Sequence, residues 1–166
     1  MTAESSTRLR PPQHPVDARA RTWWRAQGLV STVPLLIVLV VLGALIEPAR
    51  FWFVLAAVIT GLAGLVLVFV MPPWRYRVHR WETTEDAVYT AAGWFFQEWR
   101  VAPMSRIQTV DTARGPLQRM LGLASVTVTT ASAAGPITID GLDHELASQV
   151  AEHLTEVTQA THGDAT

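Results

Sequence analysis

The sequence predicts a two-helix transmembrane hairpin followed by a mainly β domain of the α+β class, in which antiparallel strands are capped by a C-terminal amphipathic helix. Two long uncharged apolar runs predict the hairpin, and short segments rich in valine, threonine and aromatic residues predict the strands. We expect a disordered cytoplasmic tail over residues 1–24, the hairpin over 25–73, a cytoplasmic domain over 74–160 and a second disordered tail over 161–166.

The two apolar runs are long enough to cross a membrane. Residues 29–46 and 51–71 carry no charged side chain, and only Glu47 to Arg50 separate them. An apolar helix of about 20 residues spans the roughly 30 Å hydrocarbon core of a bilayer. Because backbone amides in hydrocarbon need internal partners, and two segments cannot close a barrel, both runs must be helices. The alternatives are a buried hairpin in a soluble protein and a cleaved secretory signal in the first run.

The arginines predict how the hairpin is oriented. Arg50 lies in the turn, whereas three arginines lie shortly before the first span and three shortly after the second: Arg19, Arg21, Arg25, Arg75, Arg77 and Arg80. The positive-inside rule therefore places both termini in the cytoplasm, as in a multi-pass protein of the plasma membrane. Trp23 and Trp24 precede the first span, where aromatic rings are expected at the membrane interface.

Three small residues of the second span form a candidate helix-packing face. Ala57, Gly61 and Gly64 are spaced four and three apart, which lets another helix approach closely. We expect the first span, near Gly43 and Ala44, to occupy this face, and dimerisation of two copies is the alternative. No charged residue or histidine lies within either span, which argues against an ion path or a transported substrate.

The composition argues against most enzyme classes. All 13 basic residues are arginine, the net charge is −1 and there is no cysteine, so Schiff-base lysines, disulfides and thiolate metal sites are excluded. The five histidines show no His-x-x-x-His spacing, and no Gly-x-Ser-x-Gly motif is present. We therefore expect no catalysis, cofactor, metal, nucleic acid or small-molecule substrate. The expected partners are the lipid bilayer and either another membrane protein or further copies of the chain.

The pattern after the hairpin predicts six strands and two helices. The strands are expected over 76–83, 87–91, 94–101, 105–112, 125–131 and 136–140, with the last turn around 133–135. Pro116 to Leu121 begins with a proline and is followed by Gly122, which predicts a short helix. Asp143 is a good N-cap for a second helix reaching about Gln159. Its predicted apolar stripe comprises Leu142, Leu146, Val150, Leu154 and Val157.

The region from Val101 onward resembles a known family. It contains Ser-Arg-Ile-Gln from Ser105, Gly-Pro-Leu from Gly115 and Gly-Leu-Ala from Gly122, followed by Val-Thr-Val-Thr-Thr-Ala at 126–131 and Ile-Asp-Gly-Leu at 139–142. Over about residues 75–154 the chain resembles the bacterial pleckstrin-homology (PH)-like membrane proteins of the YdbS-like family. The resemblance implies a PH-like fold, a bent antiparallel sheet or partly open barrel closed at one corner by the terminal helix. It also implies an interaction or regulatory module at the membrane and does not imply an enzyme.

Two sets of polar residues are candidate contact sites. A candidate partner contact comprises Arg106, Gln108, Asp111, Arg114 and Arg119, although the first three could instead form an internal polar set at a corner of the fold. A candidate lipid contact comprises Arg75, Arg77 and Arg80, directly below the membrane exit, where each arginine can add about 1 kcal/mol of attraction to anionic lipid. Topology alone would also account for these arginines. Glu98 departs from the basic character of its segment in the family and argues against an anionic-ligand face there.

A third set has a structural interpretation. Gly115, Pro116 and Gly122 border the short helix, and glycine tolerates the sharp turns expected there. Taken together, these features predict a membrane-held interaction, scaffold or regulatory module. Sensing of anionic lipid through the juxtamembrane arginines is the alternative function.

Overall fold

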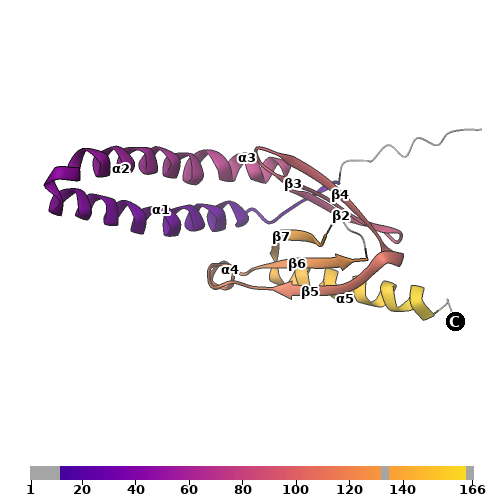
Figure 1. Cartoon of the computed structure of the whole chain (residues 1–166). Helices are drawn as coiled ribbons and strands as arrows, with labels where there is room; N and C mark the ends of the chain where they lie inside the picture. Colours follow the sequence, from indigo (N-terminus) through magenta and orange to yellow (C-terminus); the bar gives the residue numbers. More distant parts are fainter. Residues whose placement is uncertain (1–11, 132–134, 164–166) are drawn as a thin grey trace, which may run out of the picture.

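A computed structural model describes residues 12–131 and 135–163, and it shows a long helical hairpin attached to a β-rich domain (Figure 1). Helix α1 (Ala20–Leu45) is followed by a 3₁₀ turn, η1 (Glu47–Ala49), and by α2 (Arg50–Leu65). The second helix continues through a π turn, η2 (Val66–Val70), into α3 (Met71–Val78). The chain therefore leaves the second span as a helix that reaches directly into the domain.

The π turn has a local cause in the sequence. Pro72 and Pro73 have no backbone N–H, so the carbonyls of Val68 and Phe69, four residues earlier, lose their α-helical partners. The proline rings also crowd those carbonyls. The backbone between α2 and α3 accordingly widens into the i→i+5 pattern of a π-helix.

Residues 12–24 belong to the folded domain, so the prediction of a disordered tail is wrong for this part. β1 (His14–Pro15) pairs with β2 (Arg80–Thr83), and α1 begins at Ala20. Trp23 and Trp24 are 8% and 0% exposed, because they pack into the core of the domain and not at a membrane interface. Residues 1–11 of the expected tail lie outside the described part of the chain. At the other end, the last helix extends to Gly163, so the prediction of a disordered tail is also wrong for 161–163, and 164–166 are outside the described residues.

Two antiparallel sheets form the domain, in agreement with the predicted fold class (Figure 1). The first has the strand order β1-β2-β3-β4, with β3 at Ala87–Gly93 and β4 at Gln97–Pro103. After a 3₁₀ turn, η3 (Met104–Arg106), the second sheet follows in the order β5-β6-β7. Its strands are Ile107–Ala113, Leu123–Thr130 and Ile137–Asp143. Over the described residues the two sheets do not close into a barrel.

Several expected strand boundaries differ from those observed by two to four residues, and two of the differences have a clear cause. Residues 76–78 form the end of α3 and not the start of a strand, because the second transmembrane helix continues without a break into the domain. Residues 94–96 form the turn between β3 and β4, whereas their aromatic side chains predicted a strand. Residues 133 and 134 of the last expected turn lie outside the described part.

Helix α5 (His144–Gly163) covers the second sheet. Asp143 caps it, since its Oδ1 accepts the N–H of Glu145 at 2.9 Å. Ala147, Val150 and Leu154 are buried, whereas Leu146 is 38% exposed, so the predicted stripe is wrong at that position. The buried face of the helix begins at Ala147. The predicted stripe included only large apolar side chains, so it did not contain this small residue.

One hydrophobic core unites the two sheets, α5 and the beginning of α1. Its fully buried large side chains include Trp24, Val88, Ile107, Leu123, Leu142 and Leu154. Since Trp24 lies on the same helix as the first apolar run, the transmembrane hairpin and the domain share a continuous core. The hairpin is therefore attached to the domain by packed side chains and not by a flexible linker.

Candidate functional site

A polar junction joins the membrane helices to the second sheet. Arg75, on α3, places its guanidinium carbon 4.5 Å from the centroid of the Trp24 ring. Its Nη2 lies 3.3 Å from Oδ2 of Asp140, on β7, and both side chains are only about a quarter exposed (25% and 27%). The second span is thereby connected to β7 at the point where α3 enters the domain.

A chain of hydrogen bonds continues from this junction into the domain. The Ser125 hydroxyl donates to Asp140 Oδ1 at 2.8 Å and accepts from Gln118 Nε2 at 2.8 Å. Gln118 Oε1 in turn accepts the N–H of Gly115 at 2.8 Å. Gln118 and Ser125 are 5% and 7% exposed, so each is a buried polar group that is satisfied. Sequence reasoning missed Gln118. The available signal was a glutamine three residues after Gly115, the spacing at which a side chain returns to the start of a helix.

His79 lies at the edge of the junction and is 4% exposed. Burial lowers its pKa to about 4 from an ordinary 6.5, and repulsion from Arg75 adds to the effect, so the imidazole is neutral at physiological pH. Its ring meets Trp24 edge to face at a centroid distance of 5.3 Å. His79 Nδ1 has no hydrogen-bond partner among the described residues.

A polar cavity of about 270 Å³ lies beside His79, between β3, β4 and β7. Two arginines line it, and each is paired with a carboxylate: Arg75 with Asp140, and Arg100 with Glu98 at 2.9 Å. These pairs leave the cavity without a charge preference for an anionic or a cationic ligand. The described residues also contain no group of three or more His, Asp or Glu side chains that could hold a metal ion.

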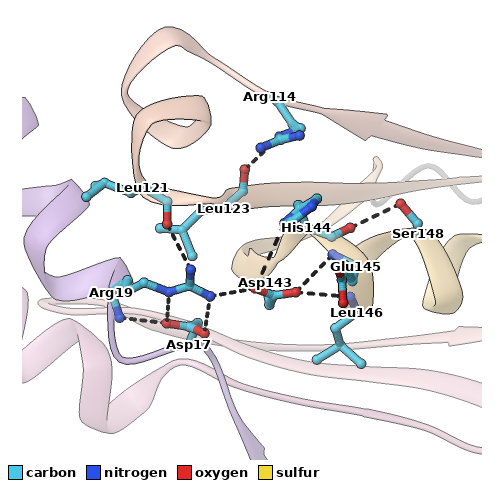
Figure 2. A network of polar contacts seen from close by, with 10 residues as sticks. All are labelled: Asp17, Arg19, Arg114, Leu121, Leu123, Asp143, His144, Glu145, Leu146 and Ser148. Atoms are coloured by element: carbon cyan, nitrogen blue, oxygen red, sulfur yellow. Dashed lines mark hydrogen bonds and ion pairs between the residues drawn. The ribbon is translucent and has the colours of Figure 1, made fainter.

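A second polar network surrounds Arg19, just before α1 (Figure 2). The guanidinium donates to both carboxylate oxygens of Asp17, at 3.0 and 2.9 Å, and to the carbonyl of Leu121 at 3.1 Å. It also donates to Asp143, the N-cap of α5. Arg19 therefore connects the start of α1, the end of α4 (Pro116–Leu121) and the start of α5.

The structure brings together only part of the candidate partner contact. Arg106, Gln108 and Asp111 are exposed and lie along η3 and β5, the outer strand of the second sheet. No ion pair joins them within the described part of the chain, and the local contact of Asp111 is with Thr109 Oγ1 at 3.2 Å. Arg114 instead donates to the carbonyl of Leu123 at 3.1 Å, and Arg119 is exposed on α4.

The remaining candidate residues have different environments. Arg75 is occupied by Asp140 and Trp24, whereas Arg77 is exposed and Arg80 is half-buried on β2. Gly115 and Pro116 begin α4, and Gly122 ends it in the left-handed conformation, with φ 67°.

The small-residue face of the second span meets α1 of the same chain. Gly64 is buried against Thr32, and the nearest atom that a Cβ at Gly61 would meet is Leu36 Cδ2, at 4.0 Å. Gly43 faces Phe53, and Ala57 lines a shallow apolar groove between the two helices together with Ala44.

The outer surface of the hairpin is apolar and exposed. Only 17% of the most apolar stretch of the first helix and 11% of that of the second are buried within the chain. A core hairpin of a soluble protein would be mostly buried. Large side chains such as Leu35, Ile37, Val58 and Phe69 are 50–62% exposed, which suits contact with lipid chains.

The apolar hairpin, the two antiparallel sheets and the terminal helix define a transmembrane protein with a PH-like domain. Residues 30–158 match the family described as Bacterial PH domain, and the chain belongs to that family. The chain is 26% identical over 156 residues to the UPF0699 transmembrane protein YdbS of Bacillus subtilis (strain 168), an alignment that covers 92% of this chain and 97% of the relative. No solved structure matches the chain significantly.

Proposed function

We propose that this protein crosses the plasma membrane twice and uses its cytoplasmic PH-like domain as an interaction or scaffold module for another membrane protein or a further copy of itself. The arginines before the first span and after the second span support an orientation with both termini in the cytoplasm. The structure-derived observation that carries the interaction role is the open edge of β5. Catalysis plays no part in this proposal.

The β5 edge has the properties of a strand-addition surface. β5 pairs only with β6 over the described residues, so no strand of this chain occupies its other edge there. Five of its seven residues are exposed: Gln108, Thr109, Asp111, Thr112 and Ala113. Such an edge can accept an extended segment of a partner through backbone hydrogen bonds. Arg106 and Asp111 then supply opposite charges along the edge that favour one direction and register of the partner.

Site-specific photo-crosslinking of the full chain in its native membrane tests this proposal. A photoreactive residue at Gln108 or Thr112 should give a discrete crosslinked product, whose mass identifies either a second protein or a second copy. The matched control is the same photoreactive residue at Glu152, an exposed position on α5. Absence of a product from both β5 positions, or the same products from Glu152, would contradict the proposal.

Anionic-lipid binding is a second candidate function, favoured by one specific observation. Arg77 is exposed on α3, and the guanidinium carbon of Arg21, an exposed residue of α1, lies 4.9 Å from the centroid of the Tyr76 ring on the same α3 helix, so one cationic side chain is carried by α3 and a second packs against it. Each can attract anionic headgroups, an attraction that salt screens. Because Arg75 has partners inside the domain, this proposal concerns mainly Arg77 and Arg80.

Lipid retention by the full chain tests this second function. Native mass spectrometry from nanodiscs containing neutral and anionic lipids should show preferential retention of anionic lipid at low salt. Arg77→Gln with Arg80→Gln should reduce that preference, whereas Arg119→Gln, on the exposed face of α4, should leave it unchanged. Equal retention of neutral and anionic lipid by the parent chain would exclude this function.

A further inference from the structure

Three consecutive aromatic side chains project from the turn between β3 and β4. Trp94, Phe95 and Phe96 are 36%, 76% and 82% exposed. Neighbouring rings meet edge to face, at centroid distances of 6.2 Å for Trp94 and Phe95 and 5.0 Å for Phe95 and Phe96. The rings therefore form one cluster at the tip of a hairpin, and none of the three is buried by the domain.

The backbone holds this turn in a tight conformation. Gly93 has φ 110°, and a Cβ at this position would collide with the carbonyl of Phe96. The seven paired positions of β3 and β4, from Ala87 with Pro103 to Gly93 with Gln97, support the turn from below. The aromatic cluster is thus carried on a well-paired hairpin.

The strand register directs the turn toward the membrane. Arg80, the first residue of β2, pairs with Ala91 on the antiparallel strand β3. Gly93 and the three aromatic residues therefore lie beyond the start of β2, on the side from which α3 arrives. Figure 1 shows the closed end of the β3–β4 hairpin beside α3, and α3 is in contact with strand β3.

We propose that Trp94, Phe95 and Phe96 insert into the interfacial layer of the bilayer leaflet from which the two spans emerge. Aromatic rings favour this layer, where an apolar body and hydrated headgroups meet. α3 begins at Met71, where the second apolar run ends, so a turn beside α3 is at the level of the headgroups. Trp74, on α3 itself, is 54% exposed at the same level.

Because the two spans anchor the domain, insertion of only three aromatic residues is sufficient for a stable contact with the bilayer. Because the hairpin already holds the domain at the membrane, docking of the turn is intramolecular and occurs at a high effective concentration. The turn would give the domain a contact with the bilayer separate from the two spans, and it would fix the tilt of the sheets against the membrane. The inference requires only that the hairpin lies in the membrane, and it is independent of whether the β5 edge binds a protein.

Depth measurements on the full chain in nanodiscs test the inference. Since the chain has no cysteine, a single cysteine at Phe95 can carry a fluorophore without background labelling. The matched control is a cysteine at Glu85, an exposed residue of the β2–β3 turn at the opposite end of the same sheet. We expect lipids carrying a quencher to quench the label at residue 95 several-fold more than the label at 85, and aqueous iodide to show the reverse order.

Two results would overturn the inference. Equal iodide quenching at residues 95 and 85 would mean that the turn is in water. Protection of residue 95 from both iodide and lipid quenchers would mean that a protein, either a partner or a second copy, covers the turn.

A second variant avoids labelling the turn itself. In Phe95→Ser with Phe96→Ser, a label at the exposed Gln97 should become several-fold more accessible to iodide than in the parent chain, with unchanged circular dichroism. Glu85→Ser should leave the accessibility of Gln97 unchanged. No difference between the double variant and the parent would contradict insertion.

Discussion

Nη2 of Arg19, the residue immediately before α1, lies 2.5 Å from Oδ2 of Asp143, the N-cap residue of α5. The other oxygen of Asp143 caps α5, and the same guanidinium also holds Asp17 and the Leu121 carbonyl (Figure 2). Elements 124 residues apart in the chain are therefore joined through one side chain. Together with the β1–β2 pairing and the buried Trp24, this contact holds the segment before the first span on the domain.

Arg19→Gln should loosen the segment before α1. The ion pairs are partly exposed, with 45% of the Arg19 side chain accessible, so the expected loss of stability is about 1 kcal/mol or less. The clearer effect should be faster hydrogen exchange over 13–19. Arg25→Gln, an exposed position one turn into α1, is the control. Unchanged exchange over 13–19 in Arg19→Gln would show that the core residues alone hold this segment.

The Arg19 network should also make the junction sensitive to acid. Hydrogen bonds from Arg19 hold the pKa of Asp17 and of Asp143 below the ordinary value of 3.8. Carboxylates whose pKa is lowered in the folded state contribute stability that is fully present above pH 3.8. This stability is lost as the pH falls through their folded-state pKa values. The difference in thermal midpoint between the parent chain and Arg19→Gln should therefore shrink below about pH 4. A constant difference from pH 7 to pH 3 would contradict this linkage.

Gly64→Ala should destabilise the transmembrane hairpin. A Cβ at Gly64 would overlap Thr32 Cγ2, and overpacking of this kind typically costs about 1 to 3 kcal/mol. Gly61→Ala is the matched control, because its Cβ would lie 4.0 Å from Leu36, in ordinary contact. Thermal unfolding in detergent should show a lower midpoint for Gly64→Ala alone. Thr32→Ser, which removes Cγ2, should restore part of the loss in the double variant, and equal midpoints for the two glycine variants would refute this packing.

Large-scale patterns in the sequence were sufficient for the fold class. The two uncharged runs reflect burial in lipid, and the alternating strand segments reflect burial of one face of a sheet. Both patterns can be read directly from the sequence. The structure and the family match confirm the hairpin, the antiparallel sheets and the terminal helix. These features are determined by many residues together, so an error at one position does not change the prediction.

Features that depend on tertiary contacts were not predictable in the same way. Trp23 and Trp24 are of the residue type, and at the position, expected at a membrane interface, but they are buried in the core of the domain. Trp94 to Phe96 have high β propensity, but Gly93 places the turn there. The polar chain from Gln118 to Asp140 joins residues 22 positions apart, and sequence spacing does not show that they meet.

His79 should make the domain less stable at mildly acidic pH. Its pKa is about 4 in the folded protein against an ordinary 6.5, so the unfolded chain binds the proton first as the pH falls. The contribution of His79 to stability is therefore fully present above pH 6.5, decreases between pH 6.5 and pH 4, and levels off below pH 4. The total loss in the free energy of unfolding is on the order of 3 kcal/mol. His79→Phe keeps a ring against Trp24 but cannot titrate, so its thermal midpoint should change less over this range. His153→Gln, on the exposed face of α5, should behave like the parent chain.

Asp140→Asn should weaken the connection between the second span and the second sheet. The substitution keeps the shape of the side chain but removes the charge that faces Arg75, which would remain half-buried over Trp24 without its carboxylate partner. Loss of a partner from a partly buried pair should cost about 1 to 3 kcal/mol, because an uncompensated charge remains. Hydrogen exchange should accelerate at the end of α3 and in β7 together, since Asp140 joins them. Asp111→Asn, on the exposed β5 edge with only Thr109 as its local contact, is the matched control and should leave both elements unchanged. If the two variants exchange alike, the shared core around Trp24, and not the Arg75–Asp140 pair, is what holds the membrane helices on the domain.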